Sequence, residues 1–356
     1  MLALIMAGGS GTRFWPKSRK KHPKQLLRIY GDRTMIQQTV DRLKPIIPVD
    51  HIFIVSTQSQ VEEIKRQLPE IPEANLLVEP VGKNTAPCIG LGALYLKRVD
   101  PDAVMVVLPA DHMVLDEERW RKQLQQAEVI ARDTSALVTL GIKPTYPATG
   151  YGYIQHTPEQ VQIDGIKAFR VKTFAEKPNY ETACRFLESG DFLWNSGIFI
   201  WKISTILREI DEYLPEIGDA LNTIDQAIGT PEELQVIDYT YRQIRSISID
   251  YGVMEHAREV YVLPGDFGWN DLGSWNEVYK IRPKDKNENA ASDRHVLLDT
   301  HGCLIDVNGK VVASIGLKDL IVVETEDALL VCPRDRAQEV RDVVEALKRK
   351  KLEHLL

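Results

Sequence analysis

A glycine-rich turn near the N-terminus carries residues suited to binding phosphate. Leu4–Arg13 runs from an apolar stretch into Gly8-Gly9-Ser10-Gly11, and Pro23-Lys24-Gln25 follows. Glycines at a strand end let backbone N–H groups turn toward an anion with no Cβ in the way. Arg13 and Lys24 add the positive charge that a triphosphate needs. The combination predicts a cradle for a nucleoside triphosphate.

Two better-known phosphate loops do not fit this segment. A Walker A loop needs G-x-x-x-x-G-K-[ST], and this turn lacks that lysine. The dinucleotide fingerprint G-x-G-x-x-G would start at Gly9 and Gly11 but meets Phe14 where its third glycine belongs. A plain flexible turn is the structural alternative for the glycine run alone, and Arg13 and Lys24 weigh against it.

Two aspartates have surroundings typical of metal ligands. Asp111 directly follows an apolar run in Leu108–His112, and Asp271 lies between two tryptophans in Gly268–Trp275. Mg²⁺ usually takes one or two carboxylates together with phosphate oxygens and waters. A solvated turn aspartate and a tryptophan core are the structural alternatives. If the two aspartates meet in space, the pair would hold one Mg²⁺.

Three further segments offer groups that suit sugar hydroxyls. Phe174–Pro178 contains Glu176-Lys177 at a strand end, where alternation points the two side chains to opposite sides. Gly150–Tyr153 and Trp194–Gly197 supply hydroxyl, amide and backbone groups. Each segment alone also fits an ordinary turn or loop.

Composition limits the class of protein. The 356 residues are 44% hydrophobic and 27% charged, which is typical of a globular protein with a large core. A net charge of −7 argues against nucleic acid as a partner. The four cysteines show no C-x-x-C spacing, which predicts reduced thiols and no zinc site. No apolar run reaches the roughly 18 residues of a membrane span, so a soluble, cytoplasmic protein with no membrane partner is expected.

Apolar runs alternate with helical patterns in the first half of the chain. The expected strands are Leu2–Ala7, Ile52–Ser56, Leu76–Glu79, Val104–Leu108 and Ala136–Leu140, and the expected helices are Met35–Ile47, Val61–Leu68, Thr85–Val99 and Glu118–Arg132. This alternation predicts an α/β domain with a largely parallel sheet covered on both faces. Binding sites in such sheets lie at the carboxyl ends of the strands. The glycine turn and Asp111 are therefore expected on the same edge.

The second half of the chain is less regular. Strands are expected at Ile166–Glu176 and Ser196–Lys202, helices at Tyr180–Ser189 and Arg336–Leu352, a capping box at Thr230–Glu233 opening a helix to about Arg245, a polar linker at Lys284–Asp293, and short strands within His295–Val331. This pattern predicts a catalytic domain over residues 1–283 and a small β-rich domain over residues 294–356.

Seven motifs in a fixed order resemble those of the sugar-1-phosphate nucleotidyltransferases over about residues 1–280. They are Ala7–Arg13, Pro23–Gln25, Glu79–Pro87, Pro109–His112, Glu176–Pro178, Trp194–Gly197 and Trp269–Asp271. Glu79-Pro80 followed by Asn84–Pro87 resembles the guanylyl branch, the mannose-1-phosphate guanylyltransferases. The resemblance implies a Rossmann-like, GT-A-like fold: a mixed, mostly parallel sheet with helices on both faces. It also implies a C-terminal domain of left-handed β-helix type that serves in packing or dimerisation, so a homodimer is one expectation.

The resemblance also implies roles for individual residues. Lys24 and Lys177 would contact phosphates near the reacting centre, and Asp111 and Asp271 would bind Mg²⁺, the one cofactor implied. The nucleotide would be bound by Ala7, Gly8, Gly9, Gly11, Thr12, Arg13, Glu79, Asn84, Thr85 and Asp111, and the sugar by Gly150, Glu176 and Asn195.

Glu79 has a chemical rationale of its own. Guanine presents N1–H and a 2-amino group side by side, and one carboxylate accepts from both, whereas adenine offers no such pair of donors. The structural alternative is an acid that merely ends a strand.

The implied reaction is transfer of a nucleotidyl group from GTP to mannose 1-phosphate, giving GDP-mannose and pyrophosphate. One alternative keeps this chemistry with UTP or dTTP and glucose 1-phosphate. Another is a silent regulatory relative that binds GDP-mannose, which should lack one of Arg13, Lys24, Asp111 or Asp271, and all four are present. A third adds an isomerase domain, for which the chain is expected to be too short.

Overall fold

A nine-stranded mixed sheet forms the centre of the first of two units into which the chain divides. The computed structural model describes residues 1–9 and 11–356, so Ser10 of the glycine turn lies outside the described residues. The first unit comprises Met1–Gly8, Val40–Ala110 and Val114–Trp269, and the second comprises Gly9–Thr39, Asp111–Met113 and Asn270–Leu356.

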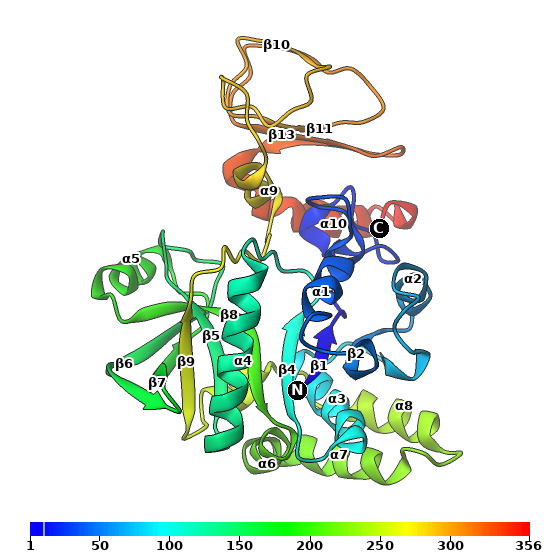
Figure 1. Ribbon diagram of the computed structural model, residues 1–356. Helices are drawn as coiled ribbons and strands as arrows, with labels where there is room; N and C mark the ends of the chain where they lie inside the picture. The colour runs from blue at the N-terminus through cyan, green and yellow to red at the C-terminus, as the bar shows by residue number, and fades with distance from the viewer. Residues whose placement is uncertain (10) are drawn as a thin grey trace. The chain divides into compact units, whose positions relative to one another are not determined.

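The strands of the first unit follow the order β3-β2-β1-β4-β8-β5-β9-β7-β6 across the sheet (Figure 1). They are β1 (Leu2–Met6), β2 (Ile52–Thr57), β3 (Leu76–Glu79), β4 (Val104–Pro109), β5 (Leu137–Ile142), β6 (Tyr153–Ile163), β7 (Ile166–Ala175), β8 (Phe192–Lys202) and β9 (Val260–Gly265). Strands β3, β2, β1 and β4 pair in parallel, as do β5 and β9, and the remaining pairs are antiparallel. The predicted mixed sheet is therefore confirmed.

Helices cover both faces of this sheet. They are α2 (Val61–Gln67), α3 (Thr85–Val99), α4 (Glu117–Thr134), α5 (Tyr180–Ser189), α6 (Ile203–Tyr213), α7 (Pro215–Ala227) and α8 (Glu233–Gln243), while α1 (Met35–Leu43) begins in the second unit and ends in the first. Alternate residues of β1 and β4, such as Leu4 and Val107, join one core cluster with α3, α6 and α7. Helix α4 packs on β4, β5, β8 and β9, and its buried residues lie outside that cluster, which places it on the opposite face.

The parallel strands bring three predicted motifs to one edge of the sheet. Because β3, β2, β1 and β4 run the same way, their carboxyl ends meet at the same edge. Strand β1 ends just before Ala7 and Gly8, and β3 ends at Glu79. The chain leaves β4 at Pro109 and reaches Asp111 two residues later.

The second unit combines an N-terminal segment with the C-terminal part of the chain. Its regular elements after residue 270 are α9 (Trp275–Ile281), β10 (Val296–Leu298), β11 (Leu304–Asp306), β12 (Ala313–Ile315), β13 (Leu320–Glu324), β14 (Leu329–Pro333), a 3₁₀ segment (Arg334–Glu339) and α10 (Val340–Arg349). Strands β10 and β12 pair in parallel, as do β11 and β13, while β14 is antiparallel to β13. Its core unites Phe14 and Trp15 with Trp275, Val340 and Val344.

Three local predictions differ from the structure. Helix α8 begins at Glu233, because the Thr230 hydroxyl accepts from the Glu232 N–H in a preceding turn and no capping box forms. The final helix divides into a 3₁₀ segment and α10. The expected linker is an integral part of the second unit: Asn289 within it is buried, donates to the Thr300 carbonyl at 2.8 Å and accepts from the Cys303 N–H at 3.0 Å.

Among the described residues, no helix is long and apolar enough to cross a membrane. The domain boundaries at residues 283 and 294 stay a prediction, as does the homodimer.

Candidate active site

The glycine turn and the Pro23-Lys24-Gln25 motif lie against each other in the second unit. Gly11 has a φ of 59°, and a Cβ there would lie 2.6 Å from the Lys24 nitrogen, so only glycine fits at this position. The Gln25 side chain donates to the Gly9 carbonyl at 2.9 Å. The two motifs are therefore one local structure, although a dozen residues separate them in the sequence.

Lys24 links the two predicted metal ligands. Its side chain is 6% exposed, and its Nζ lies 2.8 Å from Oδ2 of Asp111. The same Nζ donates to the backbone carbonyl of Asp271. Met113 and Asn270 exchange backbone hydrogen bonds of 2.9 and 3.2 Å, which set the segments of the two aspartates side by side.

The electrostatics around Asp111 favour an ionised carboxylate. Burial by itself raises the pKa of this carboxyl, but the charges of Lys24, His112 and Arg13 more than offset that effect. The pKa of Asp111 is therefore lowered below its ordinary value. An ionised carboxylate, one-third exposed, is what a hard cation requires.

The donor set at Asp111 and Asp271 fits Mg²⁺ better than a softer metal. Both offer carboxylate oxygens, and Oδ1 of Asp271 is oriented by the Gly273 N–H at 2.9 Å. The next residue, Leu272, adopts a left-handed φ of 45°, a strained conformation of the kind found at functional sites. Among the described residues, no three His, Cys, Asp or Glu side chains gather into a metal site. A metal held here would take its remaining ligands from substrate phosphates and water.

Arg13 of the glycine turn contacts the C-terminal part of the chain. Its Nη1 donates to Oε1 of Gln338 at 2.9 Å, within a 3₁₀ turn that begins at Thr12. Two tryptophan hydrogen bonds fix the following residues, from Trp275 to the Trp15 carbonyl at 3.0 Å and from Trp15 to the Leu355 carbonyl at 2.9 Å. The C-terminal residues of the second unit thus contact the glycine turn and the residues that follow it.

Glu79 lies buried in the first unit with a tyrosine partner. Its Oε1 accepts a hydrogen bond from the hydroxyl of Tyr241 on α8, and a Cβ at Gly8 would lie 3.1 Å from its Oε2. Glu79 is 4% exposed and Tyr241 is fully buried. Burial raises the pKa of Glu79 to about 7, and the hydrogen bond from Tyr241 opposes that rise. Sequence reasoning missed Tyr241, which no local motif distinguishes from a core aromatic residue.

Asn84 and Thr85 have structural partners. Asn84 has a left-handed φ of 70° and caps α3 by accepting from the Thr85 N–H at 2.9 Å. The Thr85 hydroxyl accepts from the Ile249 N–H at 2.8 Å, and Lys83 donates to the Arg242 carbonyl at 2.7 Å. These bonds fasten the loop after Glu79 to the segment that follows α8. The nucleotide contacts of Asn84 and Thr85 stay a prediction.

The predicted sugar-binding residues form a second cluster of the first unit. The expectation that the side chains of Glu176 and Lys177 point to opposite sides is wrong, because they pair directly. Both lie beyond the end of β7, and Lys177 has a left-handed φ of 44°, so strand alternation does not apply to them. A Cβ at Gly152 would lie 2.5 Å from Oε2 of Glu176, so the glycine leaves room for that carboxylate. The backbone N–H of Asn195 on β8 donates to the Gly152 carbonyl at 2.8 Å. By contrast Gly150 is exposed, with no described atom within 4 Å of its Cβ position.

Asp250 joins this cluster and was missed by sequence reasoning. Its Oδ1 accepts from Nδ2 of Asn195 at 2.7 Å. Burial, and then the charge of Glu176, raise the pKa of Asp250 to about 6. A single aspartate in an irregular segment gives no sequence signal, and the tertiary contact alone identifies it.

The tryptophans beside the motifs belong to the protein core. Trp269 packs on Tyr151 at 5.3 Å between ring centroids, and Tyr151 packs on Trp194 at 5.0 Å. Trp275 packs on Phe14 at 5.1 Å in the second unit. The structural alternative is correct for Trp269 and Trp275, because both are buried against other aromatic rings.

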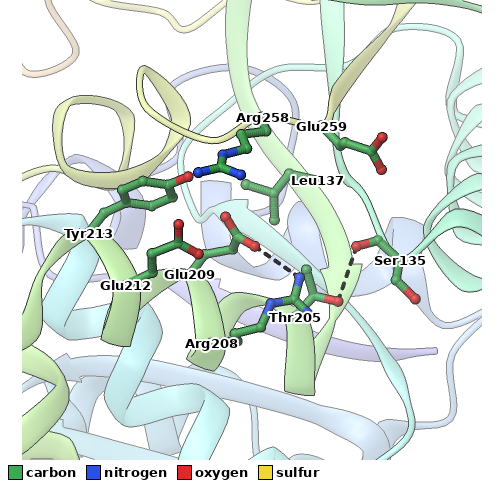
Figure 2. A pocket seen from close by; sticks show the side chains of 9 residues that line it. All are labelled: Ser135, Leu137, Thr205, Arg208, Glu209, Glu212, Tyr213, Arg258 and Glu259. Carbon is green, nitrogen blue, oxygen red and sulfur yellow. Dashed lines mark hydrogen bonds and ion pairs between the residues drawn. The ribbon is translucent and has the colours of Figure 1, made fainter.

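A separate pocket of about 120 Å³ opens near the start of β5 (Figure 2). Its walls carry both charges, with Arg208 donating to Glu209 at 2.9 Å and the Thr205 hydroxyl donating to the Ser135 carbonyl at 3.3 Å. The predicted motifs follow the carboxyl ends of strands, whereas Leu137 in this pocket begins one. The pocket contains no residue of the predicted site.

Comparisons with known proteins identify the class. A family model described as Nucleotidyl transferase matches residues 2–288, and one described as MannoseP isomerase/GMP-like beta-helix domain matches residues 293–347. The chain belongs to the nucleotidyl transferase family, as predicted. Nucleotidyltransferases of this kind generally use a divalent metal.

Individual relatives within this family show which members the chain is similar to. The chain is 38% identical over 350 residues to a mannose-1-phosphate guanylyltransferase of Escherichia coli K12, covering 97% of this chain and 73% of that protein. It is 36% identical over 356 residues to the alginate biosynthesis protein AlgA of Pseudomonas aeruginosa, covering 98% and 72%. A structure described as a mannose-1-phosphate geranyltransferase from Thermus thermophilus matches with a TM-score of 0.87 and 35% identity, covering 98% of this chain and 99% of that one.

Proposed function

We propose that this chain transfers GMP from GTP to α-D-mannose 1-phosphate, releasing pyrophosphate and forming GDP-mannose. The relatives named for this activity support the substrates. The observation that carries the chemistry is the buried Lys24 beside Asp111, with Asp271 on the neighbouring segment. This arrangement combines a fixed cation with two oxygen ligands for a metal.

The reaction needs neutralisation of charge more than proton transfer. A phosphate oxygen of mannose 1-phosphate attacks the α-phosphorus of GTP, a new P–O bond forms, and the bond to the bridging oxygen breaks to release pyrophosphate. The attacking monoester has a second pKa of about 6, so it is largely dianionic at neutral pH and needs no general base. The difficulty is the repulsion between two anions.

Each cluster has a proposed role in this reaction. Asp111 and Asp271 would hold Mg²⁺, which supplies charge neutralisation when bound. Lys24 and Arg13 would stabilise the charge that develops on the phosphates, and Lys177 would bind the phosphate of the sugar. Gly8, Gly9, Gly11 and Thr12 would offer backbone N–H groups to the triphosphate, and Ala7, Asn84 and Thr85 would line its nucleoside.

Glu79 would recognise guanine through the N1–H and 2-amino donors. Its pKa of about 7 leaves it partly protonated in the free protein, and binding a pair of donors favours the ionised form. Glu176 and Asn195 would bind the hexose. Gly150 is retained as a weaker candidate on the loop that precedes Gly152.

Pyrophosphate release with mannose 1-phosphate tests the proposal. GTP, ATP, UTP and dTTP are compared with Mg²⁺ present and after EDTA, and glucose 1-phosphate replaces the mannose ester in a parallel series. We expect turnover that depends on metal and is strongest with GTP. Equal turnover with UTP or dTTP would overturn the base assignment but leave the chemistry. No turnover with any pair would favour a regulatory protein that binds GDP-mannose.

A further inference from the structure

A single π-helical turn places Asp250 next to Asn195. The turn spans Asp250–Met254, and its defining bond runs from the Glu255 N–H to the Asp250 carbonyl at 3.0 Å. Turns of this kind are frequent at functional sites. The residue before it, Ile249, is fixed to Thr85 by the 2.8 Å bond described above. The turn is therefore held by the loop that follows Glu79.

The amide of Asn195 has little capacity left for a ligand. Its Oδ1 accepts from the Gly197 N–H at 3.0 Å, and one hydrogen of Nδ2 goes to Asp250 at 2.7 Å. One N–H donor and one lone pair of Oδ1 remain, and each sugar hydroxyl needs an acceptor for its own hydrogen. The carboxylates of Glu176 and Asp250 therefore supply most of the acceptor capacity in this cluster.

The two carboxylates differ in their partners. Glu176 pairs with Lys177, whereas the Asp250 side chain accepts from the neutral amide of Asn195 and forms no ion pair within the described residues. Burial and the nearby Glu176 raise the pKa of Asp250 to about 6. A part-buried acid that forms no ion pair and lies beside polar groups is a candidate for a functional role.

We propose that Asp250 is a specificity residue that accepts hydrogen bonds from the hexose hydroxyls and selects the sugar. This inference rests on the proposed function and deepens it. Mannose and glucose differ only in the orientation of the 2-hydroxyl. A part-buried acceptor that pairs with a correctly placed hydroxyl discriminates against a substrate that leaves it unpaired.

The charged and titratable groups around Asp250 come from two elements. Glu176 and Lys177 follow β7, Tyr251 lies in the turn of Asp250 itself, and Glu255 directly follows that turn. A test must therefore separate the loss of an acceptor from a general change of charge. Asp250→Asn keeps the shape and removes the charge, while Glu255→Gln makes the same charge change directly after the turn and serves as the matched control.

Binding of GDP-mannose and GDP-glucose by calorimetry between pH 5 and pH 8 is the direct measurement. Their affinity ratio cancels every contribution of the nucleotide, including that of Glu79. We expect the wild-type preference for GDP-mannose to weaken as the pH falls through about 6, because the protonated acid is a poorer acceptor. In Asp250→Asn the preference should fall about tenfold and lose its dependence on pH, while Glu255→Gln keeps both.

Kinetics supply the second arm. Asp250→Asn should raise KM for mannose 1-phosphate about tenfold and leave KM for GTP within about twofold. An unchanged affinity ratio, or an equal rise in both KM values, would overturn the role of Asp250. If wild-type protein binds GDP-mannose but forms none, the proposed function fails and the binding arm still decides the role of Asp250. Failure of wild-type protein to bind GDP-mannose would overturn both.

Discussion

Glu79 and Asp250 of the first unit and Asp111 and Asp306 of the second have opposite electrostatics. At the first pair burial dominates, and it raises the pKa of Glu79 to about 7 and that of Asp250 to about 6. In the second unit, neighbouring cations more than offset burial and lower the pKa values of Asp111 and Asp306. The same chemical group thus has two different protonation properties in the two units.

This difference follows from the immediate partners of the four acids. Neutral donors, the Tyr241 hydroxyl and the Asn195 amide, contact the raised acids. Lysine and arginine contact the lowered ones. A carboxyl group with a pKa near neutral pH suits the recognition of uncharged N–H and O–H groups. A carboxyl group with a lowered pKa stays ionised and suits a metal or an ammonium ion.

Asp111→Asn should have the largest effect of all the changes that test this contrast. Removing the ionised oxygen leaves Lys24 without its partner and removes a metal ligand. We expect kcat/KM for pyrophosphate release to fall about 10³-fold or more. The variant should also need a higher Mg²⁺ concentration than the wild type to reach half of its maximal rate.

The matched control is Asp342→Asn, which removes a charge from an exposed position in the same unit. It should leave kcat/KM unchanged. If Asp111→Asn retained more than a tenth of the wild-type rate at saturating Mg²⁺, Asp111 would have no role at the reacting centre.

Glu79→Gln should erode nucleotide preference by about 10²-fold, because an amide cannot accept from two guanine donors at once. The measurement is the ratio of kcat/KM for GTP to that for UTP. Glu181→Gln removes an exposed helical ion pair in the same unit and should leave that ratio unchanged. A preference that survives in Glu79→Gln would place base recognition elsewhere.

The same variant should be more stable than the wild type above neutral pH. The folded pKa of Glu79 lies above its ordinary value of 4.5, so its contribution to stability is present below pH 4.5 and is lost as the pH rises through about 7. The full loss is on the order of 3 kcal/mol. Urea denaturation at pH 5 and pH 8 should show the advantage of Glu79→Gln growing with pH.

Tyr241→Phe should have a smaller effect on nucleotide binding, and it should act by changing the pKa of Glu79. The hydroxyl stabilises the ionised carboxylate, so its removal should raise the pKa of Glu79 further above 7. We expect KM for GTP at pH 7 to rise about tenfold and to recover as the pH increases. Tyr239→Phe, an exposed residue on the same helix, is the control. A rise in KM that is independent of pH would indicate a packing defect.

The sequence alone predicts the parallel strands β1, β2, β3 and β4 and most of helices α3 and α4. An apolar run such as Val104–Leu108 directly indicates a strand, because a strand buried on both faces consists of consecutive hydrophobic residues. Strands β6 and β9 were not predicted, since β6 is largely polar with only its first two residues buried and β9 contains Pro264.

The candidate site was predicted where its residues belong to local motifs. Lys24, Asp111 and Glu79 each follow a recognisable strand or turn. Tyr241 and Asp250 depend on contacts across 162 and 55 positions of the chain, and neither carries a local signal. For the same reason the packing of Gly9–Thr39 with the C-terminal residues was not predicted.

Asp306→Asn should have the smallest effect on catalysis and a clear effect on stability. Asp306 is 5% exposed and pairs with Lys17 at 2.8 Å and with Arg282 at 2.7 Å, joining the N-terminal segment of the second unit to its C-terminal part. Breaking a fully buried pair costs roughly 3–5 kcal/mol. We expect about 2 kcal/mol here, because Lys17 and Arg282 both reach solvent and retain part of their hydration.

The pH dependence distinguishes this role from that of the acids in the first unit. Burial raises the pKa of Asp306, but Arg282 and Lys17 lower it further than burial raises it, so its stabilising contribution is present above its ordinary value of 3.8 and is lost as the pH falls below it. In urea denaturation the deficit of Asp306→Asn should therefore shrink with acid, the reverse of the trend for Glu79→Gln. The comparison is made at neutral pH and below pH 3.8, and Glu339→Gln, in an exposed pair of the same unit, should show no deficit at neutral pH. A deficit that stays constant with pH would mean that Asp306 acts through packing, and the electrostatic contrast between the two units would then apply to Asp111 alone.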